Sequence, residues 1–183
     1  MRVLGISGSL RRDSYNTQLL RVARELAPEG IELELYEGLG EIPAYNQDVQ
    51  DERAPAAVEE LRERIGEADA VLIATPEYNG SLPGVLKNAV DWASRPFPDN
   101  CLRNKPVAVV GASTSAYGGV WAQADLRRVL GITGARVVEG NVAIPHAKEK
   151  FDLDGRLVDP DYRMELGELV RDLVAQVELR IAA

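Results

Sequence analysis

The pattern of apolar and polar residues predicts strands that alternate with helices along the chain. Residues 2–7 (RVLGIS), 70–75 (AVLIAT) and 106–112 (PVAVVGA) are short apolar runs, typical of strands covered on both faces. Residues 31–36 (IELELY) alternate strictly, so this strand has one wet face or lies at the edge of a sheet. A fifth strand is predicted over residues 136–144.

Helical periodicity fills the segments between these strands. Apolar residues recur at helical spacing in 19–26, after Pro55, after Pro83, and in the last helix over 166–181. A further helix is predicted around Trp121, Ala124 and Leu130. Segment 38–55 has no such period and is expected to be irregular. The alternation predicts a single α/β domain spanning residues 1–183. Its core is a doubly wound five-stranded parallel sheet in the order 2-1-3-4-5, with helices on both faces.

Three polar loops follow the first, third and fourth strands. They cover residues 8–18, 76–83 and 113–119. In a doubly wound sheet, ligands bind beyond the carboxyl ends of the strands, at the point where the strand order reverses. The sequence therefore predicts that these loops form one binding site.

The first loop, GSLRRDSYNT, has the composition of a phosphate site. It matches neither the dinucleotide fingerprint G-x-G-x-x-G nor the P-loop, which requires Lys. It does bring hydroxyl, amide and guanidinium groups to the start of a helix, where anions are favoured. The groups are Ser9, Arg11, Ser14, Asn16 and Thr17. An ordinary capped turn with solvated arginines is the alternative.

The second and third loops suit a flat heteroaromatic ring. In TPEYNGS, Pro76 and Gly80 would shape the backbone and Tyr78 would supply an aromatic wall. The alternative is a Tyr that only packs on its neighbours. The third loop, STSAYGG, offers similar groups for the other edge of the ring.

Together these motifs resemble the NADPH-dependent FMN reductase family, a flavodoxin-like group that includes chromate, quinone and azo-dye reductases. The resemblance rests on G-S-x-R-x-x-S-x-N and P-E-Y-N-x-S-x-P-x-x-L-K-N-x-x-D-W, and covers roughly residues 2–145. It implies that the first loop binds the FMN phosphate. It implies ring contacts from Pro76, Glu77, Tyr78, Asn79, Gly80 and Ser81, and closure of the far side by Ser113, Ser115 and Gly118.

The resemblance also implies an enzyme, an NAD(P)H-dependent reductase. Hydride would pass from NADPH or NADH through FMN to free flavin, a quinone, an azo dye or a metal oxyanion. The chemistry would take place at flavin N5, so no catalytic side chain is expected. Homodimers or homotetramers are implied, with residues 95–104 as one contact. Two alternatives stay open: a flavodoxin-type one-electron carrier without its own NAD(P)H activity, and a nucleotide-binding module without flavin.

Composition narrows the choice of partners and location. The net charge of −8 and pI near 4.8 argue against a nucleic-acid partner. We see no apolar run long enough for a membrane span, and a single cysteine suits a reducing compartment, so a cytoplasmic protein is expected. His146 and Cys101 form no metal cluster and no catalytic pair, so neither is assigned a role.

Overall fold

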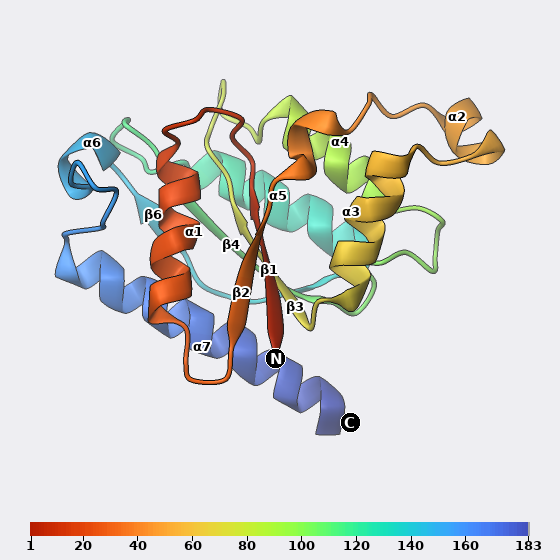
Figure 1. Cartoon of the computed structure of the whole chain (residues 1–183). Helices are drawn as coiled ribbons and strands as arrows, with labels where there is room; N and C mark the ends of the chain where they lie inside the picture. The colour runs from red at the N-terminus through yellow and green to blue at the C-terminus, as the bar shows by residue number, and fades with distance from the viewer. Residues whose placement is uncertain (183) are drawn as a thin grey trace.

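A parallel sheet with helices on both faces forms the centre of the molecule (Figure 1). The computed structural model describes residues 1–182. The strands are β1 (Arg2–Ser7), β2 (Glu32–Tyr36), β3 (Ala70–Ala74), β4 (Pro106–Ala112), β5 (Arg136–Val137) and β6 (Val142–Ile144). Their order is β2-β1-β3-β4-β5, with β6 also paired to β4. The predicted order is confirmed, and the alternating strand β2 lies at the edge.

Two helices cover one face of the sheet and three cover the other. The first face carries α1 (Tyr15–Leu26) and α7 (Pro160–Ala182), and the second carries α3 (Ala56–Glu67), α4 (Gly84–Ala93) and α5 (Val120–Thr133). Shorter helices are η1 (Gly38–Glu41), α2 (Gln47–Glu52) and α6 (Ala147–Lys150). No helix within residues 1–182 is both long enough and apolar enough to cross a membrane.

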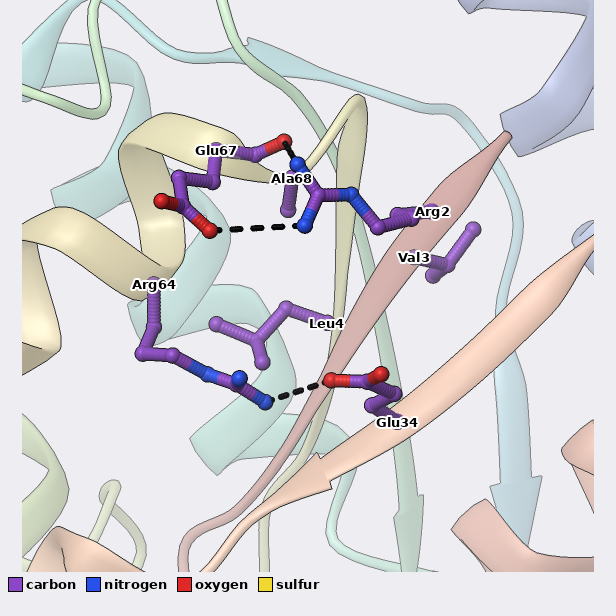
Figure 2. A pocket seen from close by; sticks show the side chains of 7 residues that line it. All are labelled: Arg2, Val3, Leu4, Glu34, Arg64, Glu67 and Ala68. Atoms are coloured by element: carbon purple, nitrogen blue, oxygen red, sulfur yellow. Dashed lines mark hydrogen bonds and ion pairs between the residues drawn. The ribbon is translucent and has the colours of Figure 1, made fainter.

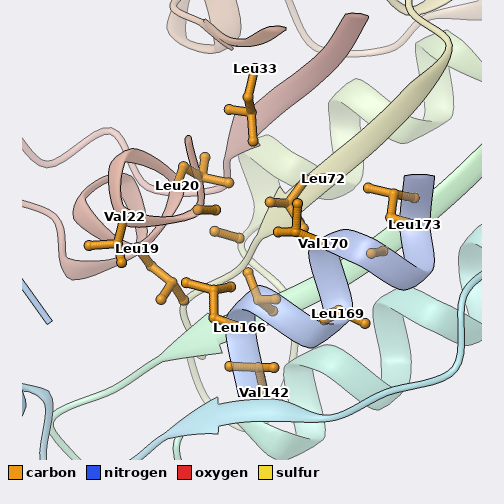
Figure 3. Close-up of a cluster of buried hydrophobic side chains, with 14 of the residues drawn as sticks. Leu19, Leu20, Val22, Leu33, Leu72, Val142, Leu166, Leu169, Val170 and Leu173 are labelled. Carbon is orange, nitrogen blue, oxygen red and sulfur yellow. The ribbon is translucent and has the colours of Figure 1, made fainter. Parts of the chain in front are cut away.

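Successive side chains of each central strand enter different cores. Val3 and Leu72 face α1 and α7, whereas Leu4 and Ile73 face α3, α4 and α5. Figure 3 shows the first core, in which leucines of α1 and α7 meet beside Leu72. Because both faces are buried, these strands read as continuous apolar runs in the sequence.

The fifth strand is broken, contrary to the single strand predicted over residues 136–144. β5 and β6 both pair with β4, and the chain leaves the sheet between them. There the Arg127 guanidinium donates to the carbonyls of Val109, at 2.9 Å, and Gly140, at 2.6 Å. Burial lowers the pKa of Arg127. A side chain from α5 thus replaces part of the missing ladder, which hydrophobic periodicity could not reveal.

Segment 38–55 is more regular than its sequence predicts. It contains η1 and α2, and Asn46 caps α2 by accepting a hydrogen bond from the Asp48 N–H at 2.9 Å. The segment is held over α4 by Trp92, whose indole donates to the Pro43 carbonyl at 2.8 Å. Asn before a short polar helix is a recognised cap signal, so this helix could have been identified.

Candidate cofactor site

The loops after β1, β3 and β4 enclose a pocket at the carboxyl ends of the strands. It is a depression of about 150 Å³. The loops start from adjoining strands, and the Gly8 N–H donates to the Ala74 carbonyl at 2.8 Å. The pocket is lined by Ser9, Arg11, Ser14, Tyr15, Asn16, Pro76, Glu77, Tyr78, Ala112, Ser113 and Thr114. Groups from all three predicted loops are therefore brought together.

The first loop presents hydroxyls and one guanidinium at the start of α1. Ser14 caps this helix, its Oγ accepting from the Asn16 N–H at 3.2 Å. Ser9 Oγ accepts from the Arg11 N–H at 3.3 Å. The exposed Arg11 guanidinium donates through Nη2 to the Asp13 carbonyl at 2.7 Å. Because a guanidinium carries five N–H donors, Arg11 retains donors for an anion.

Asn16 and Thr17 lie in the first turn of α1, and their side chains bond to other parts of the chain. Asn16 is buried, and its amide both donates to and accepts from the backbone of Ala112, each bond being 2.9 Å long. The Thr17 and Ser7 hydroxyls are 2.8 Å apart. These bonds hold the start of α1 against the ends of β4 and β1.

The second loop is a tight hairpin that rises above the sheet (Figure 1). Tyr78 and Ser81 exchange backbone hydrogen bonds of 3.0 and 3.2 Å. Asn79 and Gly80 between them have φ angles of 54° and 76°, the left-handed pair that favours Asn-Gly in two-residue hairpins. The Tyr78 side chain is half exposed at the rim, where it can flank a flat ring.

Two residues of this loop that were predicted to contact the ring form hydrogen bonds with α5. Glu77 Oε2 accepts from the backbone N–H groups of Trp121, at 3.0 Å, and Ala122, at 3.1 Å. Ser81 Oγ donates to Asp125 Oδ2 at 2.6 Å. Hydrogen bonds from Ser81 and from Arg128 lower the pKa of Asp125.

The third loop contributes Ser113 to the pocket lining, while Ser115 and Gly118 lie beyond it. The hydroxyls of Ser113 and Ser115 are 3.0 Å apart. Gly118 has a φ of 61°, and a Cβ at this position would stand 2.6 Å from the Ala143 carbonyl carbon. Glycine is therefore required here for packing against β6.

Three lining residues were not predicted from the sequence: Tyr15, Ala112 and Thr114. The Tyr15 ring lies 5.4 Å from the Phe151 ring, which connects the pocket to the segment after β6. Tyr15 stands between two predicted residues, so its place in the motif was the available signal. His146 is exposed, and its backbone N–H donates to the Ser115 carbonyl at 3.0 Å.

The donor set of the pocket fits FMN. At one side Ser9, Ser14 and Arg11 offer hydroxyls and a guanidinium at the N-terminus of a 12-residue helix, the chemistry that phosphate requires. At the other side Tyr78 and the exposed tip at Gly80 offer an aromatic wall and close backbone approach for a planar ring.

A charged cavity at the opposite end of the sheet lacks both the hydroxyl groups and the aromatic wall of this pocket (Figure 2). Its volume is about 20 Å³, enough for about one water molecule. Arg2 pairs with Glu67 at 3.3 Å, and Arg64 pairs with Glu34 at 2.6 Å. Each charge already has an opposite partner, so this cavity offers no site for a cofactor.

Comparisons with known proteins agree with the site. The model of the NADPH-dependent FMN reductase family matches residues 1–149. An NAD(P)H-dependent FMN reductase of Pseudomonas aeruginosa is 46% identical, over 98% of this chain and 94% of the relative. A 2-hydroxy-1,4-benzoquinone reductase of a Burkholderia species is 37% identical, over 98% of each.

A solved structure of similar sequence has the same fold. FerB, a flavoenzyme NAD(P)H:(acceptor) oxidoreductase from Paracoccus denitrificans, superimposes with a TM-score of 0.87 at 38% identity, over 97% of each chain. The fold is therefore flavodoxin-like, as the resemblance implied. The chain belongs to the NADPH-dependent FMN reductase family, and it is an oxidoreductase that uses FMN and NAD(P)H.

Proposed function

We propose that this protein takes reducing equivalents from NAD(P)H and passes them through FMN to small acceptors, quinones in particular. Free flavin, azo dyes and metal oxyanions are further acceptors of this proposal. Relatives named as FMN reductase and quinone reductase support it. The observation that carries it is the pocket itself, which joins phosphate-binding groups to an open rim suited to a flat ring.

In this proposal, different residues of the pocket bind the phosphate and the ring of FMN. Ser9, Ser14 and Arg11 would hold the phosphate, and the hairpin at Tyr78 would flank the ring. Bound FMN supplies hydride transfer at N5. The protein contributes position and an accessible ring, so no side-chain acid or base is assigned to the reaction.

Exposed aromatic rings at the rim support a planar acceptor. Tyr78, Tyr117 and Trp121 are each at least half exposed, and the rings of Tyr117 and Trp121 are 4.8 Å apart. The backbone N–H of Trp121 donates to Glu77, which lines the pocket, so this residue is linked to the lining. Such rings stack on quinones and on nicotinamide alike, which favours two substrates that occupy one opening in turn.

Anaerobic mixing of the FMN-loaded protein with NADPH and, separately, with NADH tests this function. Rapid bleaching of the flavin by either donor, followed by recovery of colour on adding a quinone, is expected. Failure of both donors to bleach it, together with a persistent one-electron-reduced form on chemical titration, would identify an electron carrier instead. A protein that binds no FMN would contradict the proposed function and leave the nucleotide-binding module without flavin as the alternative to test.

We also propose that the protein acts in the cytoplasm as a homodimer or homotetramer. Its free cysteine suits a reducing compartment. Phe97 and Ile132 are about two-thirds exposed, at 67% and 70%, and line one depression of about 370 Å³ between α4 and α5. A protruding ring and an apolar depression on one face permit two-fold pairing.

Light scattering at micromolar concentration tests the assembly. A mass above the 20.0 kDa of one chain is expected. Phe97→Asp should lower that mass, whereas Leu153→Asp, at a fully exposed turn, should not. A 20.0 kDa particle for the unaltered protein would contradict the assembly.

A further inference from the structure

The hairpin at the rim of the cofactor pocket is attached to α5 through a carboxylate. We propose that Glu77 is a positioning residue, whose carboxylate holds this hairpin against α5 and makes no contact with the flavin ring. The inference rests on the proposed FMN site and assigns a different task to a residue that the family motif places among the ring contacts. It is carried by the two hydrogen bonds to Trp121 and Ala122.

Glu77 replaces the N-cap side chain that α5 lacks. Trp121 and Ala122 are the second and third residues of α5, whose N–H groups an N-cap side chain usually bonds. The N-cap residue of α5 is Gly119, which has no side chain and a φ of 79°. Glu77 Oε2 accepts both N–H groups from outside the helix, at 3.0 and 3.1 Å. A carboxylate at the positive end of this 14-residue helix is favourable.

Glycine at position 119 allows this arrangement. A Cβ there would lie 3.7 Å from both Glu77 Cβ and the Thr75 carbonyl oxygen, in a conformation that L residues rarely adopt. A side chain that extended from this position would compete with Glu77 for the start of α5. Glu77 of the second loop therefore supplies the cap of α5, and its hydrogen bonds connect this loop directly to the helix.

A second bond attaches the other strand of the same hairpin. Ser81 Oγ donates to Asp125, one helical turn beyond Trp121. Tyr78, next to Glu77, is tied to Ser81 by both backbone hydrogen bonds. The hairpin is thus fixed to α5 at both strands, while its tip at Gly80 stays exposed. Fixing the hairpin before FMN binds lowers the ordering cost of binding.

Titration of the apoprotein with FMN and with riboflavin tests the proposal, because the two ligands share the ring and differ in the phosphate. Glu77→Ala should weaken both by the same factor, about five- to tenfold, as expected for loss of a helix cap. Glu77→Gln should bind both within about threefold of the unaltered protein, because its amide oxygen can accept the same two N–H groups. Glu168→Gln, at an exposed carboxylate on α7, controls for charge.

Amide hydrogen exchange provides a readout that is independent of the cofactor. In the apoprotein, exchange at Trp121 and Ala122 should be faster in Glu77→Ala and unchanged in Glu77→Gln. If Glu77→Ala fails to fold, Ser81→Ala breaks the second attachment and should weaken both flavins equally, by a smaller factor.

Three results would overturn the inference. The first is unaltered affinity for both flavins in Glu77→Ala or in Ser81→Ala. The second is a changed ratio of FMN affinity to riboflavin affinity in Glu77→Ala. The third is a shift of the bound-flavin spectrum in Glu77→Gln, which would indicate contact between the carboxylate and the ring. If the unaltered protein bound no FMN, the proposed function would fail instead.

Discussion

The two ends of the parallel sheet use their charged residues in different ways. At the amino end, the cavity of Figure 2 is lined by ion pairs of Arg2 with Glu67 and of Arg64 with Glu34. At the carboxyl end, Arg11 is exposed in a pocket lined by hydroxyls. One end satisfies its charges within the chain, and the other leaves a cation exposed in a pocket.

The amino end also contains buried polar groups that are bonded within the chain. Lys105 is only 6% exposed, and its ammonium donates to the carbonyls of Gly66 and Ala68 at the end of α3. Cys101, just before β4, donates its thiol to the Ala93 carbonyl. A cation at a helix C-terminus is favourable, so these contacts stabilise the fold.

The carboxyl end uses polar side chains to hold loops in place. Asn16 bonds the backbone of Ala112, and Glu77 bonds the start of α5. These bonds satisfy the backbone and leave Arg11 and Ser9 for a ligand. Charged groups that are paired within the chain at the amino end should therefore support stability. Polar groups that are held in place at the carboxyl end, and that keep free donors or acceptors, should support binding.

The largest expected effect concerns Cys101 at the amino end. Burial raises the pKa of its thiol from 9.0 to about 11. Since only the thiolate is alkylated, reaction with iodoacetamide at pH 8 should be about a hundredfold slower than for an ordinary thiol, and should speed up about tenfold per pH unit toward pH 11. Alkylation of the native protein as fast as that of the denatured protein would show that this end is open.

Substituting Lys105 should lower stability without affecting the other end. Lys105→Met keeps most of the aliphatic stem and leaves the carbonyls of Gly66 and Ala68 without their donor, at a cost of about 2–3 kcal/mol in the free energy of unfolding. Urea denaturation measures this cost. FMN affinity at a temperature where the variant is folded should be unchanged, and a large loss of affinity would show that the two ends are coupled.

Asn16 should affect both stability and binding, because it lines the pocket while its amide is bonded to the backbone of Ala112. Asn16→Ala leaves the N–H and C=O of Ala112 unpaired, costing about 1–3 kcal/mol of stability. FMN and riboflavin affinities should fall by equal factors. Asn16→Asp retains an acceptor for the Ala112 N–H and should be intermediate in stability. Loss confined to FMN would instead make Asn16 a phosphate ligand.

The smallest effect is expected for the ion pair of Arg2 with Glu67. Both side chains are about half exposed, so solvent screens the pair. Arg2→Gln should change the free energy of unfolding by less than about 1 kcal/mol and leave FMN affinity unaltered. A larger loss of stability would mean that the amino end depends on this pair more than its exposure indicates.

Hydrophobic periodicity predicted the sheet, because strands such as β3 and β4 are buried on both faces and β2 is not. It failed at residues 136–144, where the gap is filled by Arg127, a contact distant in sequence. It also missed α2, whose polar composition gives no apolar stripe and whose signal was the cap at Asn46.

Motif spacing predicted which loops form the pocket and most of the residues that line it, but not which of their polar groups are already bonded within the chain. Asn16, Glu77 and Ser81 carry groups that could bind a cofactor equally well, and only the folded arrangement directs them to Ala112, α5 and Asp125. Tyr15 was not predicted, although it stands between Ser14 and Asn16 in the motif.

The central claim is that the open end of the sheet binds FMN through its phosphate, and Arg11 tests it most directly. Titration of apoprotein carrying Arg11→Ala should show FMN affinity lowered by about 1.5–3 kcal/mol, ten- to more than a hundredfold, with riboflavin affinity unchanged. Arg12→Ala, at an exposed neighbour outside the pocket lining, is the matched control and should bind FMN normally. Equal FMN affinity in Arg11→Ala and the unaltered protein would contradict the account.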